Sequence, residues 1–328
     1  MGDADEIAIE DLIPDEDAVI TMSRRGYIKR TLLSNYQAQR RGGKGISGVQ
    51  TGDGDFIHNF LLTTNHQSLL IFTNLGKMYQ IKAHQVPEGS RYAKGVHIAN
   101  LLPLEKDEYA CWAQSIREFD DERSLLFVTR RGMVKRSSLG LYQNCRSTGI
   151  RAVTLKPGDE LMRVLVVEDQ DADCVLVTEK GTAIRFKVSD ARSMGRVTAG
   201  VKGIALKGND QVVAGVVTGD ASRMQLLTVS EGGYGKRTGL DMYRLQSRGG
   251  KGIINMKVTN KTGKVLGALM VSNSDEIVLL TSGNKIIRLN VGELRSTGRA
   301  TQGVRLVRMD EGVSVAGFDL VRLDEKES

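Results

Sequence analysis

The segment of this chain whose residue types best suit a chemical role is residues 39–45. It consists of Gln39, Arg40, Arg41, Gly42, Gly43, Lys44 and Gly45. Glycine carries no side chain, so backbone N–H groups in such a loop can approach a bound anion closely. The flanking bases add positive charge. This combination favours binding of a phosphate group.

The segment is not a nucleotide-hydrolysing P-loop, because a GxxxxGK[ST] loop needs Ser or Thr directly after its lysine. Here Gly45 follows Lys44, and in a similar segment Gly252 follows Lys251. The chain has four histidines, which are His58, His66, His84 and His97. None is spaced with Cys, Asp or Glu as a metal site requires, and no HExxH motif or Ser/His/Asp order is visible. The residues therefore indicate binding without catalysis.

The elements that must position this segment belong to an internal repeat. In each copy an apolar, β-rich run leads to Ser or Thr, then two residues, a turn residue, and often a base three or four residues later. The copies are residues 18–30, 68–80, 124–136, 173–185, 225–237 and 276–288. The turn residues, spaced by 49 to 56 positions, are Gly26, Gly76, Gly132, Gly181, Gly233 and Asn284. Because Gly and Asn tolerate a positive φ, we expect a left-handed residue in a hairpin turn.

A second phrase, Arg-x-x-x-Gly followed by Ile or Val, comes after the turn. It starts at Arg41, Arg91, Arg196, Arg248 and Arg299, with a shorter version from Arg146 to Gly149. Further strand-like runs follow, so each unit holds about four short strands. A period near 50 residues with four strands is typical of propeller blades. We predict an all-β, propeller-like disc of six blades, at about residues 18–67, 68–123, 124–172, 173–224, 225–275 and 276–321.

Continuous apolar runs mark the strands that we expect inside each blade. Residues 69–72, 125–128, 175–177 and 277–280 are predicted to be inner strands buried on both faces. The two ends of the chain differ in composition. Residues 1–17 contain eight acids and no base, and we expect a disordered linker there, in a fragment of a longer protein. Residues 322–328 are expected to be a charged tail.

The net charge is +7, so removing the eight negative charges of the linker leaves +15 on the rest of the chain. The basic positions outside residues 39–45 that we expect to bind DNA are Arg24, Arg25, Lys29, Arg30, Arg130, Arg131, Lys135, Arg136, Lys180, Arg185, Lys236, Arg237, Arg248 and Lys251. In a ring of blades, one repeat position lies at one height, which gives a basic belt. Such a belt suits the phosphates of duplex DNA. The alternative interpretation is that polar turns simply keep the surface solvated.

The cysteine pattern fits a reducing compartment. Cys111, Cys145 and Cys174 are widely spaced, which disfavours disulfides and a zinc site. No signal peptide and no apolar run of membrane-spanning length is visible. We expect a cytoplasmic protein that has no membrane partner.

Residues 18–321 resemble the C-terminal domain of the DNA gyrase A protein family. Residues 39–45 look like the complete gyrase-A box, and residues 36–38, 100–104 and 235–237 are similar as well. The resemblance implies a six-bladed β-pinwheel that wraps DNA with positive handedness and so enables ATP-dependent negative supercoiling. It also implies partners, which are the rest of gyrase A and also gyrase B, in an A2B2 enzyme at the nucleoid. Catalysis, ATP and Mg²⁺ would belong to those parts, and we expect no cofactor in this chain.

Two alternatives remain open from the sequence. A topoisomerase IV-type domain would lack an intact box and wrap weakly, and a propeller could instead be a platform for other proteins. Residues 246–252, QSRGGKG, nearly repeat the box, with Ser247 in place of a base. They are either an ordinary repeat element or a second strong DNA anchor.

Overall fold

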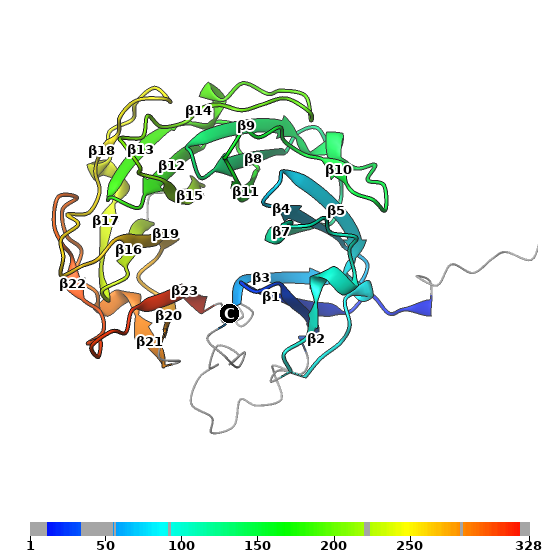
Figure 1. Cartoon of the computed structure of the whole chain (residues 1–328), viewed down its shortest axis with the longest axis horizontal. Coiled ribbons are helices and arrows are strands. Elements are labelled where there is room, and N and C mark those ends of the chain that lie inside the picture. Colours follow the sequence, from blue (N-terminus) through cyan, green and yellow to red (C-terminus); the bar gives the residue numbers. More distant parts are fainter. Residues whose placement is uncertain are drawn as a thin grey trace, which may run out of the picture.

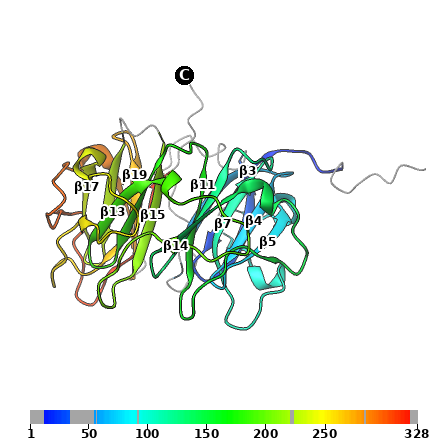
Figure 2. The same ribbon diagram turned by 90° about the horizontal axis from the view of Figure 1, so that it is seen from above.

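The computed structural model describes residues 12–33, 55, 57–90, 93–219, 224–282 and 285–321. Residues 39–45 and Asn284 lie outside the described residues, as do residues 1–11 and 322–328. Viewed down its shortest axis, the chain forms β-sheets arranged in a ring (Figure 1). Seen from above, the ring is a thick disc (Figure 2). The strands β3 and β23 bring the first and last sheets into contact near the axis.

One hairpin per repeat forms the body of each sheet. The hairpins are β1 (Asp17–Ser23) with β2 (Tyr27–Leu32), β4 (Ser68–Thr73) with β5 (Lys77–Lys82), β8 (Ser124–Thr129) with β9 (Met133–Ser138), β12 (Asp173–Thr178) with β13 (Thr182–Lys187), β16 (Gln225–Ser230) with β17 (Tyr234–Gly239), and β20 (Glu276–Thr281) with β21 (Ile286–Asn290). The five turn glycines that are described have φ values from 77° to 84°. The predicted left-handed hairpin turns are confirmed at these positions.

A third strand of each repeat lies on the axis side of its hairpin. These innermost strands are β3 (Ile57–Thr64), β7 (Ala110–Ile116), β11 (Leu161–Val167), β15 (Val212–Thr218), β19 (Val265–Val271) and β23 (Val315–Val321). The apolar runs in β4, β8 and β12 are buried at every position, as predicted. The same prediction is wrong for residues 277–280 in β20, where Val278 and Leu280 are only partly buried. The runs in β4, β8 and β12 are second from the axis, however, because the innermost strand pairs with their other edge.

The fourth strand of each described four-stranded sheet comes from the next repeat. These exchanged strands are β6 (Val96–His97), β10 (Ile150–Arg151), β14 (Val201–Lys202), β18 (Ile253–Ile254) and β22 (Val304–Arg305), which pair with β2, β5, β9, β13 and β17. The sixth sheet has the described order β21-β20-β23. The prediction of a six-bladed, all-β pinwheel is confirmed. A blade in space is therefore not one unit of the sequence.

We call the segments that carry the exchanged strands the exchange loops. They are residues 83–97, 139–151, 188–202, 240–254 and 291–305. Each begins with a short 3-10 helix, and these are η2 (Ala83–Gln85), η4 (Leu139–Tyr142), η5 (Val188–Asp190), η7 (Leu240–Met242) and η8 (Val291–Glu293). A further short 3-10 helix, η3 (Ile98–Asn100), follows β6. Since the exchanged strand is the outermost strand of its sheet, the exchange loops form the outer edge of the disc.

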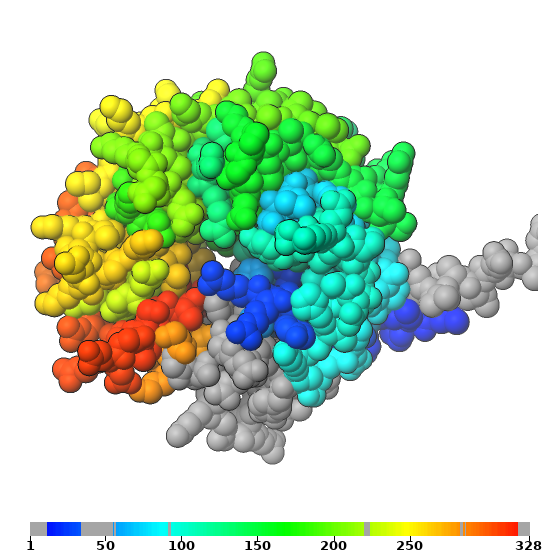
Figure 3. All heavy atoms as spheres, in the orientation of Figure 1, coloured from blue at the N-terminus to red at the C-terminus, as the bar shows by residue number. Residues whose placement is uncertain are grey.

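The hydrophobic core lies between neighbouring blades. In β4, Leu69 and Ile71 pack with residues of the first blade, whereas Leu70 and Phe72 pack with residues of the third. Side chains alternate between the two faces of a strand, so a continuous apolar run serves both interfaces. Full burial of each such side chain stabilises the fold by about 1.5–3 kcal/mol. In the space-filling view, neighbouring blades touch around the ring (Figure 3).

The end of the acidic segment contacts the first blade. The amide of Asn65 donates to the backbone carbonyl of Pro14 at 2.8 Å, and the backbone N–H of His66 donates to Asp15 at 2.9 Å. Asp17 already belongs to β1. These contacts give residues 14–17 a fixed place on the first blade, which differs from the disorder expected for the whole of residues 1–17.

Candidate nucleic-acid interface

The bases in the hairpin turns are exposed, but acidic residues lie beside them. Arg24, Arg25, Arg131 and Lys180 are exposed, and Arg130 is partly so. The backbone N–H groups of Arg25, Arg131 and Lys180 each donate to an aspartate at 3.0 Å. These acceptors are Asp55, Asp159 and Asp210.

A further acid meets a turn base directly, because Arg130 pairs with Glu160 at 2.9 Å. The turns themselves hold few acids in the sequence. The aspartates come from the segments that precede the innermost strands, 28 to 30 residues away. The turn end of the disc therefore carries mixed charge.

Three predicted DNA-contacting lysines lie in the interior. Lys29, Lys135 and Lys236 are at most 2% exposed. Lys29 and Lys236 donate from Nζ to backbone carbonyls in the exchange loop of the following repeat. Lys135 donates to the carbonyl of Arg196 in the exchange loop of the following repeat and also to that of Ala152 in its own repeat. The bonds measure 2.8 Å from Lys29 to Ala93, 2.6 Å from Lys135 to Ala152 and 2.7 Å from Lys236 to Arg299. A buried ammonium needs such acceptors, so we leave these lysines out of the DNA-contacting set.

Burial also lowers the pKa of two of these lysines. Removal from water, with a smaller contribution from the charge of Arg196, lowers the pKa of Lys135 to about 7. Burial and the charge of Arg299 lower the pKa of Lys236 to about 8. Desolvation disfavours the charged form of an amine, which explains the direction.

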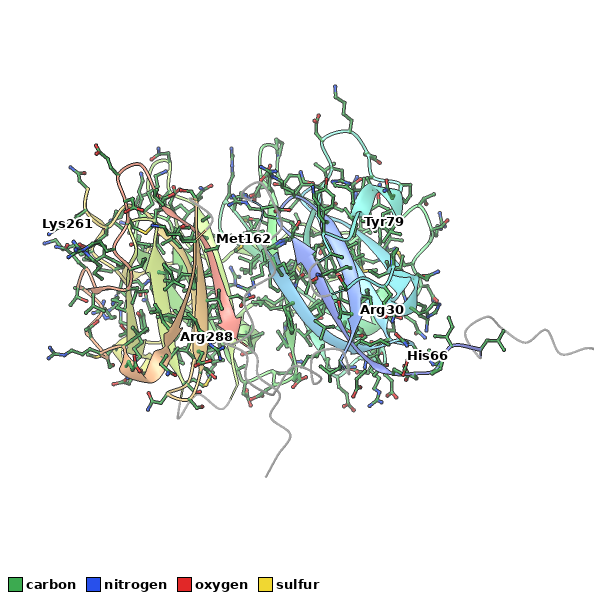
Figure 4. All side chains as sticks on the ribbon, turned by 90° about the horizontal axis from the view of Figure 1, so that it is seen from below. Arg30, His66, Tyr79, Met162, Lys261 and Arg288 are labelled. Atoms are coloured by element: carbon green, nitrogen blue, oxygen red, sulfur yellow. The ribbon has the colours of Figure 1, made fainter. Side chains whose placement is uncertain are left out.

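The arginine at the next position of the repeat also ties an exchange loop to its blade. Arg30, Arg136 and Arg237 directly follow the three lysines, and Arg185 holds the same position in β13. Arg30, Arg136, Arg185 and Arg237 donate to the backbone carbonyls of Val86, Ala191, Tyr243 and Leu294, respectively, at 3.3, 2.7, 3.2 and 2.5 Å. Arg30 also donates to Asn65, next to His66, and Figure 4 shows Arg30 and His66 near one another. All four arginines are half-buried. We leave them out of the DNA-contacting set as well.

The outer edge presents bases that the sequence patterns did not single out. The exposed ones in the exchange loops are Lys94, Arg146, Arg151, Arg192, Lys202, Arg244, Lys251, Arg295 and Arg305, of which only Lys251 was predicted. The described residues of these loops hold twelve bases and four acids, so the edge is strongly positive. The sequence does contain a signal for three of these exposed bases. An arginine lies four residues before the arginine of the second phrase, at Arg192, Arg244 and Arg295.

The comparisons with known proteins agree with this architecture. The family described as "DNA gyrase C-terminal domain, beta-propeller" matches residues 17–64, 67–109, 123–168, 172–218, 225–272 and 275–322. The chain belongs to this family of DNA gyrase C-terminal domains. The six matched segments correspond to the six repeats that the structure turns into blades.

Two curated relatives support the assignment. The DNA gyrase A protein of Lawsonia intracellularis is 58% identical over 316 residues, which cover 96% of this chain and 38% of that protein. The DNA gyrase A protein of Helicobacter pylori (strain 26695) is 43% identical over 310 residues, covering 94% and 37%. The chain thus spans less than two fifths of the length of these relatives.

Two solved structures are similar as well, each at 28% identity. The C-terminal domain of DNA topoisomerase IV has a TM-score of 0.79, with 94% of this chain and 94% of that chain covered. The DNA gyrase A C-terminal domain has a TM-score of 0.75, with 93% and 99% covered. The likeness in fold therefore extends over both kinds of topoisomerase domain.

In this gyrase-type domain, arginines of the second phrase link neighbouring exchange loops. Arg196, Arg248 and Arg299 each donate from Nη1 to the carbonyl of the second residue of the preceding exchanged strand. These carbonyls belong to Arg151, Lys202 and Ile254, at 3.2, 3.2 and 2.8 Å. Backbone bonds add to the links, for example from Ala205 to Gly250 at 2.8 Å. The outer edge is thus a hydrogen-bonded band.

The last glycine of the second phrase allows the exchange loop to pack closely against the hairpin. A Cβ atom at Gly252 would lie 2.5 Å from the backbone oxygen of Ala183, and one at Gly95 would lie 2.4 Å from that of Ile28. No real Cβ atom fits so close. Glycine there lets the exchanged strand approach its hairpin, whereas the sequence suggested only an exposed backbone for phosphate.

Other chemistry is limited within the described part of the chain. Its His, Cys, Asp and Glu residues form no group that could hold a metal ion. None of its helices is long and apolar enough to cross a membrane. The three cysteines are free thiols, and burial raises the pKa of Cys111 to about 12. The guanidinium carbon of Arg163 lies 4.3 Å from the centroid of the Trp112 ring, so the two side chains stack.

Proposed function

We propose that this domain binds duplex DNA without strong sequence preference and wraps it with positive handedness around its outer edge. The observation that carries the proposal is the positive band of exchange loops. Phosphates recur along any duplex, so contacts from this band need no particular base. The wrap would serve ATP-dependent negative supercoiling by gyrase, in an assembly of two A and two B subunits at the bacterial nucleoid.

The outer edge suits this task better than the turn end of the disc. Bending a duplex costs energy, which additional phosphate contacts along the bend must offset. The edge offers such contacts on successive blades, whereas aspartates accompany the bases at the turns. In the repeat, residues 39–45 correspond to residues 246–252, which belong to an exchange loop. Residues 39–45 therefore stay in the proposed DNA-contacting set.

A topology assay tests the proposal. The domain is bound to relaxed circular DNA, the complex is treated with a topoisomerase I, and the sign of the retained writhe is read after deproteinisation. We expect positive writhe that increases with protein concentration. Binding without retained positive writhe would contradict wrapping.

The likeness to a topoisomerase IV domain supports one alternative, which is weak wrapping by a domain of that type. The same assay distinguishes it, because such a domain would retain little writhe at saturation. The complete motif at residues 39–45 and the gyrase relatives favour the gyrase role. Absence of DNA binding at low salt would instead support a platform for other proteins.

A further inference from the structure

In four blades an arginine at the same position of the repeat closes the junction between the hairpin and the exchange loop. Arg30, Arg136, Arg185 and Arg237 form parallel backbone bridges with Glu88, Ser193, Leu245 and Ser296. Their guanidinium groups then bond to carbonyls at or just beyond the end of the 3-10 helix. These junctions are therefore filled by protein side chains.

The second blade departs from this pattern. Gln80 pairs with Leu70 in β4, just as Arg136 pairs with Leu126 in β8, so Gln80 occupies the position of the arginine. Its amide donates to Ser68 of its own hairpin at 3.1 Å. The described residues show no backbone bridge from Gln80 to the exchange loop at 139–151. The shorter side chain leaves the junction open.

The space left is an open groove of about 880 Å³, which we call the blade-2 groove. It is lined by β5, by residues of the exchange loop at 139–151, and by the start of the next second phrase. In that exchange loop the phrase is one residue shorter, from Arg146 to Gly149, than the phrase from Arg196 to Gly200. The replacement of the arginine by Gln80 and the shorter second phrase therefore occur at the same junction, between β5 and the exchange loop at residues 139–151.

The chemistry of the blade-2 groove is that of a phosphate site. None of its fourteen lining residues is acidic, and four are bases, which are Lys82, Arg146, Arg151 and Arg196. Four amide side chains and the hydroxyl of Thr148 supply further hydrogen-bonding groups. Guanidinium groups bind phosphate oxygens through paired N–H donors.

The two exposed arginines are available for a ligand. Arg146 and Arg151 are exposed, and their guanidinium groups have no hydrogen-bond or ion-pair partner within the described part of the chain. The other two bases are already held in place, because Arg196 donates to the carbonyl of Arg151 at 3.2 Å and Lys82 donates to that of His66 at 3.0 Å. The groove thus combines a fixed wall with two available cations.

We propose that the blade-2 groove binds backbone phosphates of the wrapped duplex, where the duplex passes from the second blade to the third. The inference rests on the proposed function, because it names a contact point of the same outer edge. A concave site lets donors converge on one phosphate from several sides, which a convex edge does not. Gln80 is the residue that leaves room for it.

The first test removes the two available cations. The double variant Arg146→Ala/Arg151→Ala is compared with Lys106→Ala/Lys261→Ala, which removes two exposed bases outside the exchange loops. Duplex affinity is measured over a range of salt concentrations. The groove variant is expected to weaken binding about tenfold and to reduce the salt slope by about 0.9 for each phosphate that is no longer bound. Equal effects of the two double variants would overturn the proposal.

The second test fills the groove without removing a charge. Gln80→Arg restores the arginine of the other blades and is expected to weaken duplex binding, although it adds a positive charge. Ser247→Arg adds the same charge to another exchange loop and is expected to strengthen binding. Tighter binding by both variants would contradict the groove. This test does not depend on whether the double alanine variant folds.

A third arm separates DNA from small anions, with tripolyphosphate as the probe in calorimetry. Competition between tripolyphosphate and the duplex that disappears in Arg146→Ala/Arg151→Ala supports a shared phosphate site. Tripolyphosphate binding with an unchanged duplex salt slope in that variant would overturn the proposal in favour of a small-anion site. Normal wrapping by all variants contradicts the groove alone, whereas no wrapping by the unmodified domain contradicts the proposed function.

Discussion

The Nζ atom of Lys236 lies 2.7 Å from the backbone carbonyl oxygen of Arg299, although 63 residues separate them. The same amine donates to the carbonyl of Gly298 at 2.9 Å and to the hydroxyl of Thr238 at 3.1 Å. Lys236 has no exposed surface. A lysine of the fifth hairpin thus holds the exchange loop of the sixth repeat from inside, and Lys29 and Lys135 do the same in the first and third blades.

Replacement of this amine should reduce stability rather than DNA contact. Lys236→Met keeps most of the volume but leaves the carbonyls without a donor, which costs about 1–3 kcal/mol. Urea unfolding gives the free energy. The matched control is Lys251→Met, an exposed lysine of an exchange loop, for which we expect a change within about 0.5 kcal/mol. Equal stability of the two variants would show that the buried bonds contribute nothing.

The lowered pKa of Lys135 makes stability depend on pH. The folded-state pKa is about 7, against an ordinary value of 10.5. Between these values the unfolded chain binds more protons than the folded chain, so the free energy of unfolding rises with pH through this window. Below about pH 7 both states are protonated and the dependence ends.

The test compares the unmodified domain with Lys135→Met at pH 7 and pH 9. We expect the free energy of unfolding of the unmodified domain to increase relative to that of the variant on going to pH 9, because only the unmodified domain has the shifted amine. A difference between the two proteins that is the same at both pH values would contradict the assignment.

Bases at the outer edge should matter more for DNA than bases at the hairpin turns. The triple variant Arg192→Gln/Arg244→Gln/Arg295→Gln removes edge charges at one repeat position. We expect its salt slope for duplex binding to fall by about 0.9 for each phosphate released. The matched control, Arg24→Gln/Arg131→Gln/Lys180→Gln, removes three turn charges and is expected to change the slope less. The reverse order would place the DNA at the turn end of the disc.

Within residues 246–252, the near copy of the box, we expect Arg248 to stabilise the fold and Lys251 to contact DNA. Arg248 donates to the carbonyls of Lys202 and Asp190 at 3.2 and 2.9 Å, so Arg248→Ala is expected to lower the midpoint of thermal unfolding. Lys251 is exposed, so Lys251→Ala is expected to weaken DNA binding with little change in that midpoint. If neither variant alters affinity or retained writhe, residues 246–252 are an ordinary repeat element.

Local signals were enough to predict much of the fold. A hairpin is made by neighbouring residues, so the apolar runs and the turn glycines, such as Gly132 with its φ of 78°, identify it directly. The repeat of this hairpin predicts six blades. The exchange of strands was not predictable in this way, because β10 and its counterparts are two residues long and pair with a different repeat.

The sequence by itself determined the hairpins, the number of blades, the positive charge and the family. Only the tertiary structure decided which bases face solvent. Lys29 and Lys251 were both predicted to contact DNA, yet an exchange loop covers Lys29, whereas Lys251 is exposed on such a loop. The open junction at Gln80 likewise depends on the exchange loop at residues 139–151, a distant part of the sequence. Burial of a charge is set by contacts between distant segments, and a local pattern of residues carries no record of them.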